Sequence, residues 1–479
     1  MYFLYSLALA ILFIVLLPRF IYQALKHGKY ADSFKERMGR LPDSLASDER
    51  ETVWVHSVSV GEFQAARPLI ERLRRELPEA RLVVSTITLT GQRLARAHCP
   101  SLVDGVFYFP FDFRFAVRRA LMHIRPSLVV ILETELWPNF LGECQQLGAM
   151  TVVANGRISE RSFGRYKRVR PFIKRVLRNV SLLVMQTEAD AERARTLGAL
   201  AIGVRVCGNL KYEAGVAGQT SEVVGEGGLE VSNDIRSANL SSAIRPSNAV
   251  SDLDDQFALS AGAPVIVAGS TAPGEEEILL QALRDVRARR GLESTRLLIA
   301  PRHPERFDEA ADLIARSGFS SARRSQPSAA SQASERGSLS PANATDPRAA
   351  DVVLLDSIGE LQSAYMFASV VFVGGSLVPR GGHNVIEPAA YRKPIIVGPH
   401  TENFKQIVDD FVSADAIVQL SAGEASISSL ASELARLLSD REAAVRIGAR
   451  AGELLASRRG AVECTVAAIK EIFAPRHLS

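Results

Sequence analysis

Cysteine is scarce in this sequence, with four residues among 479 and no Cys-x-x-Cys pair. A disulfide framework or a structural zinc site would need several cysteines at short, regular spacing. The scattered positions predict neither, and they fit a reducing compartment. The four residues are Cys99, Cys144, Cys207 and Cys464.

Motifs for metal ions and nucleoside triphosphates are also missing. There is no Asp-x-Asp motif at the end of an expected strand, no His-x-x-x-His pair and no Walker loop. The net charge is only +4, which is too small to indicate a nucleic-acid partner. We therefore expect a reaction that uses neither a metal ion nor a cofactor.

Charge is absent from the N-terminus up to Arg19, in the apolar run "YFLYSLALAILFIVLLP". A helix rises about 1.5 Å per residue, so this segment can cross a hydrocarbon core of about 30 Å. Basic residues follow the run and none precedes it, which favours a single-pass transmembrane anchor over 1–25 and a cytoplasmic remainder. The alternative is a helix that is buried or lies in the membrane interface, because the run is short and contains Pro18.

After the N-terminal run, short apolar segments alternate with helical patterns in two series. Segments such as "TVWVHSVSV" and "SLVVILE" are rich in β-branched residues and apolar on both faces, as buried parallel strands are. Each series predicts a doubly wound, Rossmann-like α/β domain. The expected order is an N-terminal domain over 30–213, a low-complexity linker over 214–256, a C-terminal domain over 257–456 with a disordered insert over 320–350, and a C-terminal helix over 457–479.

The most informative stretch of the second series is "FVGGSLVPRGGHNVIEPAA", in which two glycine pairs separate a strand from a helix. Glycine pairs let the backbone approach a ligand closely, and a helix N-terminus suits an anionic group. Asn384 and Glu387 at this helix start are therefore candidates for a nucleotide site, Glu387 through the ribose hydroxyls. The alternative is that Asn384 caps the helix and Glu387 completes a pair resembling a capping box.

Two other strand ends of the second series carry candidate ligand-binding residues. Arg302 follows "RLLIAP" and is suited to hold a phosphate, although a surface pair with Glu305 or Glu309 would also explain it. The tripeptide 358–360 follows "DVVLLDS" and is placed to hydrogen-bond a base through its backbone. A plain helix start is the alternative for this tripeptide.

In the first series, Glu62 follows Gly61 at a turn between a strand and a helix. This carboxylate would repel a phosphate, so the turn is not expected to bind one. The helix N-terminus stabilises the ionised carboxylate and predicts a lowered pKa, which suits a general base. The alternative is a first-turn glutamate that only favours the helix.

Three further charged residues follow strands of the first series. Glu133 and Glu135, in "ETELWPN", stand at the end of a strong strand, where packing does not readily explain two carboxylates. Lys211, in "GNLKYE", follows the last strand, and its amine is able to neutralise a leaving phosphate. The alternative for Lys211 is a solvated surface charge.

The segment 157–179 combines nine arginines and lysines with apolar residues at helical spacing. Such a pattern is typical of a helix that packs on a sheet and turns a basic face outward. It is equally typical of a surface that binds anionic lipid headgroups. The residues themselves leave both interpretations open.

Together these stretches resemble the Kdo transferases (3-deoxy-D-manno-octulosonic acid transferases) of lipopolysaccharide synthesis. The matching motifs fall within 53–405 and include "HSVSVGE", "ETELWPN", "GNLKY", "PRHPERF" and "GGHNVIEPAA". Members of that family have a GT-B fold, in which two Rossmann-like domains face each other across a cleft, and they transfer Kdo from CMP-Kdo to the lipid A precursor. The resemblance implies the same fold and activity here, at the bacterial inner (cytoplasmic) membrane.

The resemblance also implies roles for individual residues. Glu62 would be the proton acceptor, and Glu133 and Lys211 would stabilise the transition state of an inverting, metal-independent transfer to lipid IVA. The nucleotide-binding residues that it implies are Pro301, Arg302, Ile358, Gly359, Glu360, Asn384, Val385, Ile386 and Glu387.

Two other functions remain open at this stage. One is a GT-B transferase or epimerase that uses a UDP-sugar, which would bind UDP rather than CMP. The other is a membrane-tethered nucleotide-binding protein without catalytic activity, in which replacing Glu62 would change nothing measurable.

Overall fold

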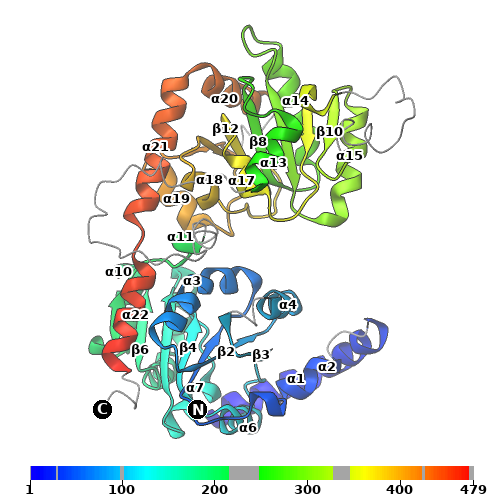
Figure 1. Cartoon of the computed structure of the whole chain (residues 1–479). Coiled ribbons are helices and arrows are strands. Elements are labelled where there is room, and N and C mark those ends of the chain that lie inside the picture. Colours follow the sequence, from blue (N-terminus) through cyan, green and yellow to red (C-terminus); the bar gives the residue numbers. More distant parts are fainter. Residues whose placement is uncertain are drawn as a thin grey trace. The chain divides into compact units, whose positions relative to one another are not determined.

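The computed structural model of the chain describes residues 2–27, 31–97, 102–214, 248–326, 346–422 and 427–473. It contains two compact units (Figure 1). Unit 1 comprises Met1–Ala214 and Arg458–Ser479, and unit 2 comprises Gly215–Ser457. Each unit is built on its own seven-stranded parallel sheet, as the two series of strands predict.

The sheet of unit 1 has the order β3-β2-β1-β4-β5-β6-β7. Its strands are β1 (Thr52–His56), β2 (Arg81–Thr86), β3 (Gly105–Tyr108), β4 (Pro126–Leu132), β5 (Met150–Gly156), β6 (Leu182–Met185) and β7 (Val204–Val206). Every residue of β1 and β2 is buried, which explains their continuous apolar runs. The strand order reverses between β1 and β4, and the carboxyl ends of such strands are where ligands bind in doubly wound sheets.

Helices cover both faces of this sheet. They are α1 (Tyr2–His27), α2 (Ala31–Arg37), α3 (Val60–Glu76), α4 (Leu89–Ala97), α6 (Arg114–Ile124), α7 (Pro138–Gln146), α8 (Glu160–Arg168), α9 (Arg170–Leu177), α10 (Glu188–Leu197), α11 (Lys211–Ala214) and α22 (Ala461–Ile472). One core lies between the sheet and α3 with α22, and includes Phe63, Leu69 and Val466. The other lies under α6 and α7, around the fully buried Trp54.

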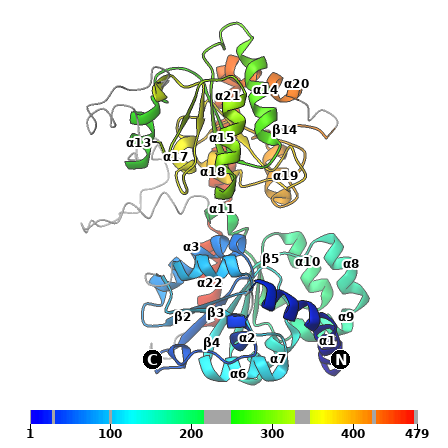
Figure 2. The same ribbon diagram turned by 90° about the vertical axis from the view of Figure 1, so that its right-hand side faces the viewer.

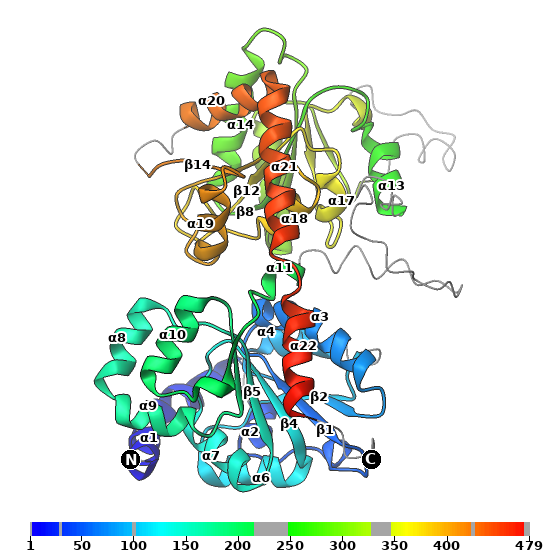
Figure 3. The ribbon, with the colours of Figure 1, turned by 90° about the vertical axis from the view of Figure 1, so that its left-hand side faces the viewer.

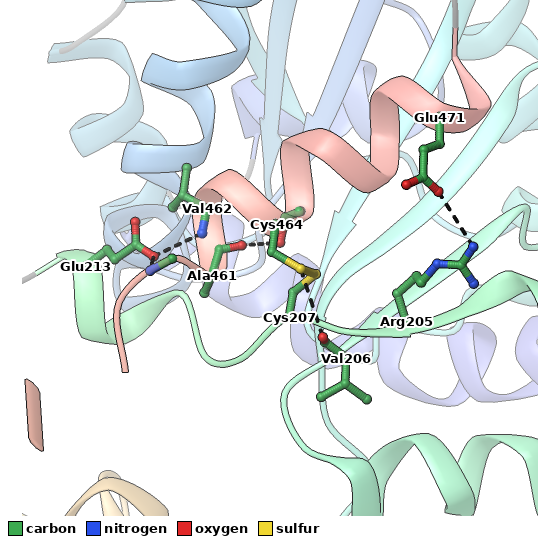
Figure 4. The surroundings of a disulfide bond; sticks show 10 residues. Arg205, Val206, Cys207, Glu213, Ala461, Val462, Cys464 and Glu471 are labelled. Carbon is green, nitrogen blue, oxygen red and sulfur yellow. Dashed lines mark hydrogen bonds and ion pairs between the residues drawn. A yellow bond between two sulfur atoms is a disulfide. The ribbon is translucent and has the colours of Figure 1, made fainter. Parts of the chain in front are cut away.

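The C-terminal helix α22 belongs to unit 1, where it packs beside α3 (Figure 3). A disulfide joins Cys464 of α22 to Cys207, which follows β7 (Figure 4). The sequence-based expectation of no disulfide is therefore wrong. The two cysteines are 257 residues apart, and only the return of the chain to unit 1 brings them together.

The N-terminal helix α1 packs on the rest of unit 1, next to α9 (Figure 2). Tyr5 donates a hydrogen bond to Asp112 at 2.9 Å, and the ring of Phe13 packs edge-on against Phe111 at 5.4 Å. Among the described residues, no helix is long and apolar enough to span a membrane. The expected transmembrane anchor over 1–25 is therefore not supported, because one face of this helix is occupied by protein contacts.

The sheet of unit 2 has the order β10-β11-β9-β8-β12-β13-β14, again with all neighbours parallel. Its strands are β8 (Val265–Thr271), β9 (Arg296–Pro301), β10 (Ser321–Arg323), β11 (Val352–Leu354), β12 (Val370–Val373), β13 (Ile395–Val397) and β14 (Val418–Gln419). Its helices are α13 (Asn248–Phe257), α14 (Glu275–Arg287), α15 (Phe307–Arg316), α17 (Leu361–Tyr365), α18 (Ile386–Ala390), α19 (Lys405–Ser413), α20 (Ile427–Ser439) and α21 (Arg441–Ser457). The strand order reverses between β8 and β12.

Two segments of low complexity are more ordered at their edges than the sequence suggests. The last residues of the expected linker form α13, whose Leu253 and Phe257 are fully buried. The first residues of the expected disordered insert form β10, which pairs with β11. Residues 215–247 of the linker and 327–345 of the insert lie outside the described residues.

Candidate active site

Glu62 lies in the first turn of α3, directly after the carboxyl end of β1. Ser59 is the N-cap, and its hydroxyl accepts a hydrogen bond from Glu62 N at 3.5 Å. The Glu62 carboxylate reaches back and accepts from Val58 N at 2.7 Å and from the Ser59 hydroxyl at 3.3 Å. The local geometry resembles a capping box, except that the carboxylate accepts from the residue before the N-cap, and it orients the carboxylate at the edge of the sheet.

The surroundings of Glu62 favour its protonated form. Burial raises the pKa of Glu62 to about 7, and the charges of Glu133 and Glu135 act in the same direction. The expected lowering of this pKa is thus wrong. A helix N-terminus contributes about 0.3–1 kcal/mol, less than one pKa unit of about 1.4 kcal/mol, so burial outweighs it.

Glu133 and Lys211 form an ion pair in unit 1, with 2.9 Å between Lys211 Nζ and Glu133 Oε1. Glu133 follows β4 and has a left-handed backbone with φ of 56°, which a non-glycine residue rarely adopts. Both side chains are about 70% buried, at 30% and 27% relative exposure. Lys211 is therefore not the solvated surface charge of the alternative interpretation.

Asn155, near the end of β5, contacts the segment that carries Lys211, and the motifs did not reveal it. Its side-chain oxygen accepts a hydrogen bond from Leu210 N at 3.0 Å, next to Lys211 in the chain. Asn155 is buried and has a φ of 57°. A buried asparagine directly before a glycine at a strand end is the signal that would have identified it.

In unit 2, the charge of Arg302 acts on both His383 and Glu387. Arg302 is exposed and follows Pro301, the last residue of β9. The pKa of His383 is lowered to about 4, mainly by burial and also by the charge of Arg302. Burial raises the pKa of Glu387, whereas the hydrogen bond from Asn384 and the charge of Arg302 lower it. Sequence reasoning missed His383 as a member of this group.

Asn384 and Glu387 contact each other directly. Asn384 Nδ2 donates to Glu387 Oε1 at 3.1 Å, and Asn384 Oδ1 accepts from Ile386 N at 3.0 Å. The two side chains thus pair as the alternative interpretation expects, but the N-cap of α18 is Val385 and not Asn384. Val385 is buried and Ile386 begins α18, so the side chains of both belong to the core.

The tripeptide 358–360 begins with an exposed residue and ends with a carboxylate held by other side chains. Ile358 is 81% exposed, and Gly359 has a φ of 93°. The Glu360 carboxylate is held by Arg324, with Nη2–Oε1 of 2.8 Å, and by the Ser357 hydroxyl. Arg324 falls in the segment expected to be disordered, so its role was not foreseen.

Close packing within unit 2 explains the two glycine pairs. A Cβ on Gly374 would lie 2.4 Å from the backbone oxygen of Ser270, and Gly375 has a φ of 68°. Side chains at Gly381 and Gly382 would meet Asn403 and the His400 backbone. The glycines are therefore required because loops of unit 2 approach one another closely. From the sequence, the same glycines were interpreted as making room for a ligand.

The structure thus brings the predicted site residues together in two groups. Glu62, Glu133 and Lys211 lie in unit 1, and all predicted nucleotide-binding residues lie in unit 2. Each group lies at the carboxyl ends of the strands of its own sheet.

Comparison with known proteins gives consistent matches. The family model described as 3-deoxy-D-manno-octulosonic-acid transferase (kdotransferase) matches residues 32–214. A 3-deoxy-D-manno-octulosonic acid transferase of Haemophilus influenzae is 30% identical over 92% of this chain and 91% of its own length. The protein of the same name from Bordetella pertussis is 32% identical over 79% of this chain and 78% of its own length.

Among solved structures, UDP-GlcNAc 2-epimerase of Neisseria meningitidis matches with a TM-score of 0.55. It covers 88% of this chain and 100% of the epimerase, at 10% identity. At such identity the likeness concerns the fold alone, which is that of two parallel-sheet α/β domains, consistent with GT-B.

Proposed function

The chain belongs to the family of 3-deoxy-D-manno-octulosonic acid (Kdo) transferases, which are glycosyltransferases of lipopolysaccharide synthesis, and from this premise we propose that it transfers Kdo from CMP-Kdo to lipid IVA with Glu62 as the general base. One observation carries the assignment of the base. Glu62 is a half-buried carboxylate with a pKa of about 7 at the strand-order reversal of unit 1, beside two further carboxylates. A general base works best when its pKa lies near the working pH.

The proposed reaction is a single displacement at the anomeric carbon of Kdo. The acceptor hydroxyl attacks this carbon while Glu62 takes the hydroxyl proton. The bond from the anomeric carbon to the phosphate oxygen breaks, and CMP leaves with the electron pair. One displacement inverts the configuration at the anomeric centre.

Glu133 and Lys211 are proposed to stabilise the transition state as a pair. Attack at an anomeric carbon develops positive, oxocarbenium-like charge, which a nearby carboxylate stabilises. The Lys211 ammonium lies 2.9 Å from the Glu133 carboxylate and forms an ion pair with it. It also supplies positive charge for a leaving phosphate. These two roles need no metal ion.

Unit 2 is proposed as the CMP-binding unit. Arg302 is exposed at the carboxyl end of β9 and forms no ion pair within the described parts of the chain, so its guanidinium is available for a phosphate. Glu387 and Asn384 lie near Arg302 and suit the ribose hydroxyls. The exposed Ile358 and the backbone of Gly359 suit the base.

The membrane association that such a lipid acceptor requires is proposed to occur along α1, without a transmembrane span. The side chains of α1 that are exposed between Phe3 and Val15 are all apolar. The large ones are Phe3, Leu4, Leu7, Ile11, Leu12, Ile14 and Val15. An exposed apolar helix face of this kind lies in the plane of a bilayer interface.

The basic helices α8 and α9 follow one another in the chain, and α9 contacts α1 at Tyr2. Arg175 of α9 lies 5.7 Å from the ring centre of Tyr2, and Phe172 packs on the same ring. All nine arginines and lysines of 157–179 are exposed. Positive charge beside an apolar helix face complements anionic lipid headgroups, including the phosphates of the proposed acceptor.

The choice of donor nucleotide is tested by titrating CMP and UDP into the purified full chain. We expect CMP to bind and UDP to bind far more weakly. Replacing Arg302 by Gln should weaken CMP binding about tenfold, since a charge-assisted hydrogen bond contributes about 1.5–3 kcal/mol. Arg316→Gln, at an exposed arginine of α15, is the matched control and should bind CMP normally.

Transfer is then assayed with lipid IVA and CMP-Kdo generated in place, with EDTA added once the donor is made. Appearance of Kdo on the lipid supports the proposal. Tighter binding of UDP than of CMP, together with no transfer of Kdo, would instead support a UDP-sugar enzyme.

A further inference from the structure

Glu275 is a fully buried carboxylate at the strand-order reversal of unit 2. It is the first residue of α14, just after β8, and its side chain has 0% relative exposure. Burying a charged group is unfavourable unless partners compensate for the lost hydration. The partners of Glu275 therefore indicate what this residue does.

Those partners are four backbone N–H groups. Glu275 Oε1 accepts from Ser376 N and Leu377 N, both at 2.9 Å. Oε2 accepts from Gly375 N at 2.7 Å and from Ala272 N at 2.8 Å. Three of the four donors belong to the turn that follows β12, about 100 residues away in the chain.

No cation neutralises this carboxylate within the described residues. Burial raises the pKa of Glu275, and only backbone hydrogen bonds oppose this effect. The neighbouring Glu276, equally buried, is different because Arg306 pairs with it at 2.8 Å. Glu275 thus serves as the anion inside a ring of backbone donors, and it fixes the 375–377 turn to the start of α14.

The 375–377 turn in turn supports the loops that carry the proposed donor site. Gly375 O accepts from Gly382 N at 2.8 Å, directly before His383 and Asn384. Ser376 O accepts from His400 N at 3.0 Å, and the Ser376 hydroxyl accepts from Gly398 N at 2.9 Å. A displacement of this turn would therefore move the segment that begins at Gly382.

We propose that Glu275 is a positioning residue for the nucleotide donor, because its carboxylate holds the 375–377 turn on which the 382–387 segment rests. The proposal rests on the assignment of unit 2 as the CMP-binding unit. Glu275 itself has no exposed surface, so it acts through the turn and touches no substrate.

The substitution Glu275→Gln tests this role because it keeps the shape and removes one acceptor. An amide has one oxygen, which can serve only one of the two pairs of N–H donors. Its NH₂ group would face the other pair, leaving two buried donors unsatisfied. Loss of buried hydrogen bonds of this kind is expected to weaken CMP binding roughly tenfold.

The matched control is Asp351→Asn, in the same unit. Asp351 precedes β11, at the opposite end of the sheet, and accepts hydrogen bonds from Ser320 N and from Arg287. This variant removes charge from a carboxylate that also holds a loop, but the loop is remote from Gly382. We expect it to lower the melting temperature and to leave the affinity for CMP unchanged.

The experiment measures CMP affinity by calorimetry, and kcat with the KM of each substrate, for the wild type and both variants. We expect Glu275→Gln to raise the Kd of CMP and the KM of CMP-Kdo about tenfold, with the KM of lipid IVA unchanged. Amide exchange should become faster at 375–377. A Kd within twofold of the wild type in Glu275→Gln, or an equal loss in Asp351→Asn, would overturn the proposal.

Two further results are informative. If the wild type binds UDP and not CMP, the proposed function is wrong. The positioning role is then tested by the Kd of UDP in the same variants, which should rise about tenfold in Glu275→Gln and stay unchanged in Asp351→Asn. If Glu275→Gln does not fold, Ser376→Ala, which removes only the hydroxyl between the turn and Gly398, replaces it. An unchanged CMP affinity in Ser376→Ala would contradict the role of this turn.

Discussion

At the scale of single residues, Glu62 is held firmly and is also hard to ionise. Its carboxylate accepts hydrogen bonds from Val58 N and Ser59, which favour the ionised form. Burial and the charges of Glu133 and Glu135 favour the protonated form more strongly. The geometry fixes the position of the proposed base, and the environment brings its pKa close to neutrality.

The pH dependence of transfer follows from this pKa. Glu62 can accept a proton only when it is ionised, so kcat should rise with pH to a midpoint near 7 and then level off. Below the midpoint the rate should fall about tenfold per pH unit. Initial rates between pH 5.5 and 8.5 at saturating donor and acceptor measure this profile.

Two variants identify the group that titrates. Glu135→Gln removes a negative charge that raises the pKa of Glu62, so the midpoint should move to lower pH. Glu79→Gln, at an exposed residue before β2, should leave the midpoint where it is. A midpoint between pH 4 and 5, or one that Glu135→Gln does not move, would disagree with the assignment.

The sequence predicts where such residues stand in the chain but not what surrounds them. Glu62, Glu133 and Lys211 were placed at strand ends correctly, since the strands are marked by their apolar runs. The raised pKa of Glu62 was not foreseen, because burial depends on packing between distant segments. The partners of Glu275 were not foreseen for the same reason, since three of its four donors lie about 100 residues away in the chain.

At the scale of secondary-structure elements, α1 has two faces with different partners. Tyr2, Tyr5 and Phe13 pack on unit 1, whereas the opposite face is exposed and apolar. The apolar run in the sequence favoured a transmembrane segment, because a sequence does not show which side chains of a helix contact the rest of the protein. The contacts with Asp112 and Phe172 make the distinction.

Membrane binding should therefore depend on the outer face of α1. The double substitution Leu4→Glu and Ile11→Glu places two charges on this face, at residues that are 65% and 55% exposed. We expect at least a roughly tenfold loss of sedimentation with vesicles containing anionic phospholipid, since burying a side chain of this size contributes about 1.5–3 kcal/mol.

The control for this experiment is Val445→Glu, at an apolar residue of α21 that is 61% exposed. It changes the charge of the chain in the same direction at a site remote from α1 in the sequence. Equal binding of the α1 variant and the wild type would exclude the proposed surface.

The helix α22 is attached to unit 1 close to a predicted catalytic residue. Glu213 Oε1 accepts from Val462 N at 2.9 Å and from Gly460 N at 3.1 Å, and so caps this helix. The Cys207–Cys464 disulfide adds a covalent link (Figure 4). Lys211 lies between Cys207 and Glu213 in the chain, so both attachments restrict the segment that carries it.

Elements that lack a strong apolar pattern were the ones missed from sequence. The helix α13 lies where Ser, Asp and Asn dominate, and it is held by the burial of Leu253 and Phe257. The strand β10 has three residues and pairs on one side with β11. Both are stabilised by tertiary contacts more than by local propensity.

At the scale of the whole molecule, the chain repeats one architecture twice. Both units are parallel seven-stranded sheets whose strand order reverses once, and both carry candidate site residues at that reversal. The sequence predicted the two series of strands. It did not predict that α22 returns to unit 1, because no motif marks the segment as part of that unit.

The measurement that tests the account most directly is Kdo transfer by the full-length chain with Glu62→Gln. Glutamine keeps the acceptor for Val58 N but cannot take a proton from the acceptor hydroxyl. We expect kcat to fall by a factor of about 10²–10⁴, with CMP affinity unchanged. Transfer by Glu62→Gln at the wild-type rate would contradict the assignment of Glu62 as the base.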